Sequence, residues 1–142
     1  MTIYLADSSV WGWAASGRRP DIEEKIAARM ERDELATCVP VVLEALHRAR
    51  TGTEYEMTFE TLFEPLHWLD LDAAAAARAF EVQRALAAST HGNHLRPALD
   101  YLIAAMAERA GAGVTLWFLD RDLRVICEHT GQPYEAEQGT SP

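Results

Sequence analysis

The sequence contains little cysteine and no long apolar segment. Only Cys38 and Cys127 occur among its 142 residues, too few for the disulfide framework that stabilises small secreted domains. We expect both to be reduced and buried, because free cysteine behaves as a small apolar core residue. No apolar run approaches the roughly 18 residues of a membrane-spanning helix, and residues 1–13 lack the basic start and cleavage site of a signal peptide. These absences predict a cytoplasmic protein with no membrane segment.

Positive charge is also scarce. Acidic residues outnumber Lys and Arg by 22 to 13, which gives a formal net charge of −9. Non-specific nucleic-acid binding depends on cations that neutralise phosphates, so this charge argues against a protein that passively coats DNA or RNA. It does not argue against an enzyme whose acids hold metal ions, since a bound metal reverses the local sign. Lys25 is the only lysine, and arginine suits bidentate contact with phosphate.

Short apolar segments alternate with helical patterns along the chain. Apolar or β-branched runs predict strands at 2–6, 35–39, 66–69 and 114–119, with a short edge strand near 133–136 as an option. Periodicity and capping residues predict helices at 10–15, 21–32, 40–50, 54–63, 72–88, 97–110 and 122–128. This alternation indicates one α/β domain, with a mostly parallel sheet covered on both faces.

Two acidic residues directly follow predicted strands. Asp7 follows the strand 2–6, and Asp120 follows 114–119, the clearest strand pattern in the sequence. In open parallel sheets, ligands bind beyond the carboxyl ends of strands, at the point where strand order reverses. If these two strands are neighbours there, the two carboxylates converge. The alternative is that each aspartate only caps the next helix, which is a common role for Asp.

Asp100 and Glu44 lie within apolar helical patterns. Asp100 falls in the first turn of the helix that Pro97 opens, where the helix dipole alone would favour a negative charge, yet it borders the apolar stripe. Glu44 interrupts the apolar run 41–46, so its helix has little polar face. The alternative for Glu44 is an exposed ion pair with Arg48, four residues later.

A cluster of these four carboxylates would suit a divalent metal ion. Mg²⁺ and Mn²⁺ prefer oxygen ligands and are usually held by a few carboxylates together with substrate phosphate. Such an ion activates water at neutral pH and stabilises the leaving oxygen of an in-line displacement. Packed acids also raise one another's pKa, which a bound metal reverses. The acids therefore predict a Mg²⁺ or Mn²⁺ site for chemistry at phosphate.

Five segments, in this order over nearly the whole chain, resemble the PIN-domain toxins of the VapC type. They are LADSSVW at 5–11, VLEAL at 42–46, PALDYLIAA at 97–105, DRDL at 120–123 and TGQP at 130–133. Each segment is unspecific by itself, whereas the set is specific. The resemblance implies a three-layer α/β/α PIN-like domain with a mostly parallel central sheet over 1–136, followed by a polar C-terminal tail over 137–142.

The same resemblance implies a function and partners. It implies a Mg²⁺- or Mn²⁺-dependent endoribonuclease that acts as the toxin of a type II toxin–antitoxin pair. It further implies a homodimer, inhibition by a VapB-like antitoxin, and DNA binding only through that antitoxin. The rival hypothesis is a non-catalytic PIN-like module that binds an antitoxin and contributes to operator DNA binding only through it. A degenerate module of this kind would usually have lost one of the acids.

The resemblance also assigns roles to residues. Asp7, Glu44 and Asp100 match the first three acids of the family, and Asp120 matches the fourth, with Asp122 as its competitor. Ser9 is similar to the small hydroxyl residue that supports the first acid.

Arginine and tryptophan supply candidates for RNA contact. The arginines are Arg18, Arg19, Arg48, Arg50, Arg96 and Arg121. Trp11 and Trp13 have three alternatives: stacking on RNA bases, lining a dimer or antitoxin groove, or ordinary core burial.

Overall fold

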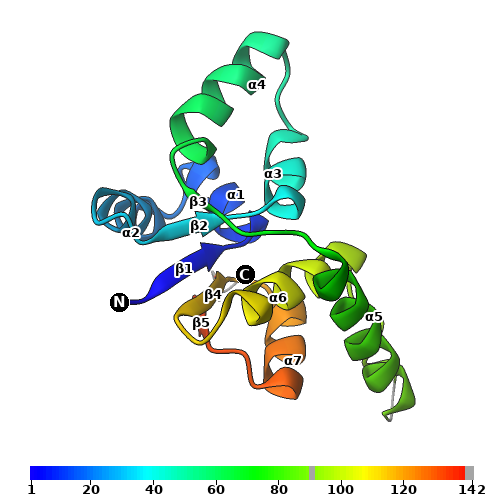
Figure 1. Cartoon of the computed structure of the whole chain (residues 1–142). Coiled ribbons are helices and arrows are strands. Elements are labelled where there is room, and N and C mark those ends of the chain that lie inside the picture. The colour runs from blue at the N-terminus through cyan, green and yellow to red at the C-terminus, as the bar shows by residue number, and fades with distance from the viewer. Residues whose placement is uncertain (90–91, 140–142) are drawn as a thin grey trace.

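Five parallel strands form the centre of the molecule (Figure 1), in the order β3-β2-β1-β4-β5. The strands are β1 (Ile3–Ala6), β2 (Leu35–Thr37), β3 (His67–Trp68), β4 (Val114–Phe118) and β5 (Tyr134–Ala136). The structure, a computed structural model, describes residues 1–89 and 92–139, so the end of the tail expected at 137–142 lies outside the described residues. The prediction of a mostly parallel sheet is confirmed, and the optional edge strand is present as β5.

Helices on both faces cover this sheet. They are α1 (Ser8–Ser16), α2 (Pro20–Glu31), α3 (Val39–Leu46), α4 (Gly52–Thr58), the π-helix η1 (Phe59–Phe63), α5 (Ala73–Ala88), α6 (Ala98–Ala110) and α7 (Arg121–Thr130). Helix α1 contacts β1 and β4, α2 contacts β2, α6 contacts β4, and α7 contacts β5. The three-layer arrangement is therefore confirmed. Among the described residues, no helix has both the length and the apolar character needed to cross a membrane.

The strand order reverses between β1 and β4. The chain leaves β1 towards β2 and β3 on one side, and it returns through β4 to β5 on the other. Strands β1 and β4 pair in register from Ile3 opposite Val114 to Ala6 opposite Trp117. Their carboxyl ends therefore meet at the topological switch point, where open parallel sheets bind ligands.

Several predicted element boundaries differ from the structure, most of them by one or two residues, and three of the differences change how a segment is assigned. Val39 begins α3 instead of ending a strand, because Pro40 favours the first helical turn. The helix expected to reach residue 50 ends at Leu46, since Thr51 caps α4 by accepting a hydrogen bond from the Glu54 amide at 3.0 Å. The helix expected at 54–63 is divided between α4 and the π-helix η1. Helix α4 has no buried residue, and Figure 1 shows it standing away from the sheet.

Candidate active site

Asp7 and Asp120 lie at the same edge of the sheet, directly after β1 and β4. Each also caps the following helix. Asp7 Oδ1 accepts a hydrogen bond from the Ser9 amide at 3.1 Å, and Asp120 Oδ1 accepts one from the Asp122 amide at 2.6 Å. Both carboxylates nevertheless line one cleft, although Asp7 is only 2% exposed. Helix capping and a place in the cleft are therefore not exclusive.

The hydroxyl of Ser9 fixes the Asp7 carboxylate. Ser9 Oγ donates a hydrogen bond to Asp7 Oδ1 and accepts one from the Leu119 amide at 3.0 Å. Because Leu119 follows β4, this hydroxyl ties the end of β4 to the carboxylate that follows β1. The geometry agrees with the supporting role that the resemblance implies for Ser9.

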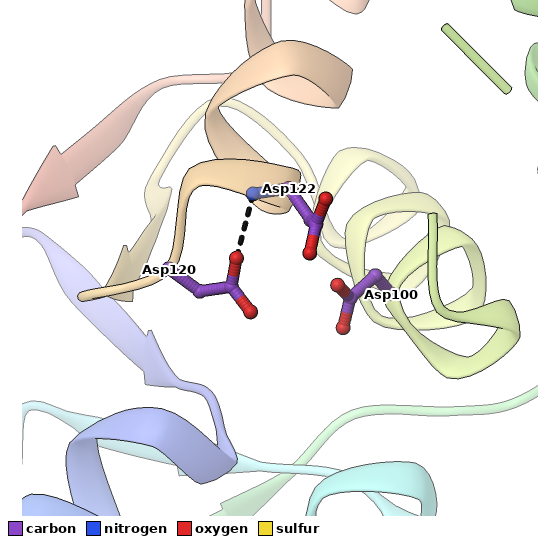
Figure 2. Close-up of side chains that lie close together, drawn as sticks. All are labelled: Asp100, Asp120 and Asp122. Carbon is purple, nitrogen blue, oxygen red and sulfur yellow. Dashed lines mark hydrogen bonds between the residues drawn. The ribbon is translucent and has the colours of Figure 1, made fainter. Parts of the chain in front are cut away.

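Asp100 reaches the same edge from the first turn of α6. Figure 2 shows its side chain directed towards Asp120 and Asp122 at the start of α7. One carboxylate oxygen from each of the three lies within 4.8 Å of the other two. Asp100 is 5% exposed, and its Oδ2 atom is buried with no hydrogen-bond partner among the described residues.

Glu44 completes the set from α3. It lines the same cleft of about 630 Å³ as Asp7, Asp100 and Asp120. Its Oε1 atom is buried and has no hydrogen-bond partner within the described chain. The exposed pair with Arg48 is absent from the ion pairs of the described residues. The structure thus brings together all four acids singled out from the sequence.

Burial and the charges of neighbouring acids make the carboxyl groups of Asp7, Asp100 and Asp120 hard to ionise. Burial raises the pKa of Asp7 to about 7, against hydrogen bonds from Ser9 that lower it, and the charge of Asp120 raises it further. The pKa of Asp100 rises to about 8, first through burial and then through the charges of Asp7, Asp120, Glu44 and Asp122. Burial is also the largest cause of the raised pKa of Asp120. A cation among these groups would restore the charged forms.

The donor set fits a hard divalent cation. All the candidate ligands are carboxylate oxygens, which Mg²⁺ and Mn²⁺ prefer. The oxygens of Asp100 and Glu44 that lack a partner are the strongest sign, since a buried polar atom without one costs about 1–3 kcal/mol. Asp122 differs, because its Oδ1 already binds Arg96 at 2.7 Å and it does not line the acid cleft.

The arginine candidates occupy different places. Arg18 and Arg48 line the acid cleft. Arg96 pairs with Asp122. Arg19 binds Asp21 at 2.9 Å and donates a hydrogen bond to the Gln138 carbonyl. Arg19 is not among the residues that line the acid cleft. Two remain, of which Arg121 lines a second cleft and Arg50 lines neither.

The second cleft contains a residue that the sequence analysis missed. It has a volume of about 540 Å³, shares Asp120 with the acid cleft, and is lined by Arg96, Arg121 and Arg124. Arg124 follows Arg121 by three residues on α7, which places both on one face of the helix. That spacing is the signal in the sequence that could have identified Arg124.

The two tryptophans next to Asp7 have different environments. Trp11 is 5% exposed and packs edge-to-face on Phe63 with 4.9 Å between the ring centroids, so core burial is its main role. Trp13 is half-buried. Both side chains line the acid cleft, and Trp13 is the more exposed of the two.

Fold and cleft together define an α/β domain with clustered carboxylates at its topological switch point. The family model of the PIN domain matches residues 4–128, and the chain belongs to the PIN domain family. The chain is 33% identical over 135 residues to Ribonuclease VapC18 of Mycobacterium tuberculosis, which covers 94% of this chain and 93% of that protein.

Solved structures share the fold at low sequence identity. The DNA-bound VapBC of Salmonella typhimurium superposes with a TM-score of 0.73 at 16% identity, over 96% of this chain and 98% of that one. VapBC2 of Rickettsia felis, bound to a fragment of its promoter, gives 0.68 at 16% identity, over 95% and 98%. These likenesses establish the fold over nearly the whole chain.

Proposed function

We propose that this protein is a metal-dependent endoribonuclease and the toxin of a type II toxin–antitoxin pair. The observation that carries the proposal is the set of four carboxylates in one cleft, two of which, Asp100 and Glu44, have a buried oxygen with no partner among the described residues. The relative named Ribonuclease VapC18 supports RNA as the substrate. The rival, a non-catalytic PIN-like module, has less support because no acid of the set is missing.

In this proposal the chain's own groups hold and orient the reactants. Asp7, Glu44, Asp100 and Asp120 would hold Mg²⁺ or Mn²⁺, with Asp122 at the border of the set. Bound there, the ion would supply Lewis acidity to activate water and to stabilise charge on the phosphate. The Ser9 hydroxyl keeps the carboxylate of Asp7 in place.

The remaining roles follow from the lining of the cleft. Arg18 and Arg48 line the cleft together with the acids and would contact phosphates of the RNA. Trp13 would stack on a base next to the cut. Arg19 is a weaker candidate than the sequence indicated, because its guanidinium already binds Asp21.

The proposed partners follow from the neighbours in structure. The VapBC assemblies from Salmonella typhimurium and Rickettsia felis are described as bound to DNA. We infer that this chain pairs with a VapB-like antitoxin, forms a homodimer, and reaches operator DNA only through the antitoxin. We further propose that it acts in the cytoplasm, where its proposed RNA substrate is present.

A direct test compares RNA cleavage by matched variants of the purified protein. Asp7→Asn removes a charge at nearly constant volume, whereas Asp70→Asn makes the same change at an exposed position outside the cleft. We expect the wild type and Asp70→Asn to cut cellular RNA with Mn²⁺ or Mg²⁺, and Asp7→Asn to leave it intact. Sequencing the new RNA ends would identify the cut sites. Full cleavage by Asp7→Asn would refute the site, and cleavage in chelator would refute the metal mechanism.

A further inference from the structure

A second cleft adjoins the acid cleft at Asp120. It lies between the start of α7 and the chain after β5, with Arg121 and Arg124 on the α7 side and residues 137–139 on the other. We propose that this second cleft binds the phosphate backbone of the RNA on one side of the cut, through Arg121 and Arg124. This inference rests on the proposed ribonuclease function, because it extends the path of the same substrate.

The distribution of free arginines supports a phosphate-binding role. Seven arginines form no ion pair within the described part of the chain: Arg18, Arg32, Arg48, Arg50, Arg84, Arg121 and Arg124. Four of the seven line the two joined clefts. In a chain of net charge −9, acidic partners are plentiful. Free guanidinium groups therefore gather where the RNA of the proposed reaction would lie.

The acids that line the second cleft do not cancel its positive charge. Besides Asp120, the only carboxylate among its described lining residues is Glu137. Glu137 already accepts hydrogen bonds from Lys25 and, at 3.0 Å, from Trp117 Nε1. Its charge is thus balanced from the far side of the wall. Arg121 and Arg124 are both exposed and can turn to a ligand in the cleft.

The wall opposite α7 is held in place by residues of α2 and its N-terminal flank. Arg19 donates to the Gln138 carbonyl at 2.7 Å, and Lys25 pairs with Glu137. A fixed wall makes a cleft that exists before the ligand binds, which limits the entropy lost on binding. Contacts from arginine to phosphate carry no base information. The second cleft should therefore add affinity without sequence preference.

The test measures how strongly RNA binding depends on salt. The probe is a fluorescently labelled pool of single-stranded RNA with randomised sequence, and Asp7→Asn serves as the background so that the probe stays intact. Affinity falls as salt rises, and each phosphate contact to a single strand adds about 0.7 to the magnitude of the slope of log affinity against log salt concentration. Introducing Arg121→Ala and Arg124→Ala into this background should reduce the magnitude of that slope by about 1.4. The two substitutions should also weaken binding roughly tenfold at moderate salt.

Matched variants separate this inference from simpler explanations. Arg32→Ala with Arg84→Ala removes the same total charge from exposed arginines outside both clefts and should leave the slope unchanged. Arg121→Lys with Arg124→Lys keeps the charge and should restore most of the slope. A slope equal to that of the Arg32 and Arg84 variant would overturn the second-cleft proposal alone. If the Asp7→Asn background protein itself binds no RNA, both the second-cleft proposal and the proposed ribonuclease function fail.

Discussion

Two groups of carboxylates on this molecule lie in opposite electrostatic settings. At the sheet edge after β1 and β4, Asp7 and Asp100 are buried beside other acids, and their pKa values rise to about 7 and about 8. At β5, by contrast, Glu135 forms an ion pair with Arg29 at 2.7 Å. Glu137, just beyond the strand, pairs with Lys25.

The difference shows where the chain places its scarce cations. The guanidinium of Arg29 lies 3.7 Å from the ring centroid of Tyr4 and 4.3 Å from that of Trp117, so it joins two central strands to Glu135 on the edge strand β5. That carboxylate is balanced by the protein itself. The four cleft acids of the proposed site form no ion pair within the described part of the chain. In the proposed site a cation from outside the chain would balance them. We therefore expect the paired carboxylates at β5 to matter for stability and the cleft acids to matter for the proposed catalysis.

The sharpest test of this difference compares one acid from each group. Asp100→Asn should lower RNA cleavage by roughly a thousandfold, because it removes a buried carboxylate that would hold the metal. Glu135→Gln should leave the cleavage rate within about twofold at temperatures where the protein is folded. Initial rates on one RNA substrate check both. Equal losses in the two variants would mean that the acid cleft has no special part in cleavage.

The second prediction concerns the stability of the metal-free protein against pH. Asp7 and Asp100 keep their protons up to about pH 7 and pH 8 when folded, whereas unfolded aspartate releases its proton near pH 4. The folded state therefore binds more protons between these values, and the unfolding free energy falls as pH rises from about 4 to 8. We expect a loss on the order of a few kcal/mol, measured by urea unfolding in chelator at pH 5 and pH 8.

Two controls assign that loss to the acid cleft. Asp100→Asn should flatten the fall in stability, because the asparagine cannot ionise. Mn²⁺ should raise the melting temperature of the wild type more at pH 8 than at pH 5, since metal binding needs deprotonated ligands. A metal-free protein that becomes more stable from pH 5 to pH 8 would contradict the raised pKa values.

The third prediction addresses the balanced carboxylates. Arg29→Ala should lower the unfolding free energy by about 2 kcal/mol, since it removes two cation–π contacts and the ion pair to Glu135. Lys25→Ala should lower it by less than about 1 kcal/mol, because the Lys25 side chain is 43% exposed. Urea unfolding of both variants provides the measurement. A larger effect from Lys25→Ala would reverse the ranking and show that burial of Arg29 matters little.

Much of this arrangement could be predicted from the sequence because its signals are local. An uncharged run that ends in Asp120 marks both the strand and the acid beyond it, and Asp7 follows a similar run. Parallel pairing then brings the two acids to one edge. Glu44 could be singled out because its own helix offers it little polar surface.

The remaining features depend on contacts between distant segments, which no local pattern encodes. Arg19 looked like a candidate for RNA contact, yet it binds the Gln138 carbonyl of the C-terminal segment. The pairing of Arg96 with Asp122 joins the loop before α6 to the start of α7. The sequence alone therefore left the choice between Asp120 and Asp122 as the fourth acid open.

The last prediction decides between these two aspartates. Asp120 lines the acid cleft, whereas Asp122 lies outside its lining and gives one oxygen to Arg96. We therefore expect Asp120→Asn to lower kcat/KM on RNA about tenfold more than Asp122→Asn does. Asp120→Asn should also raise the half-saturating Mn²⁺ concentration more than Asp122→Asn does, because it weakens metal binding. Both substitutions keep the side-chain volume, so the comparison isolates charge. The opposite ranking would make Asp122 the fourth acid and Arg96 the group that has to release it before a metal ion can bind.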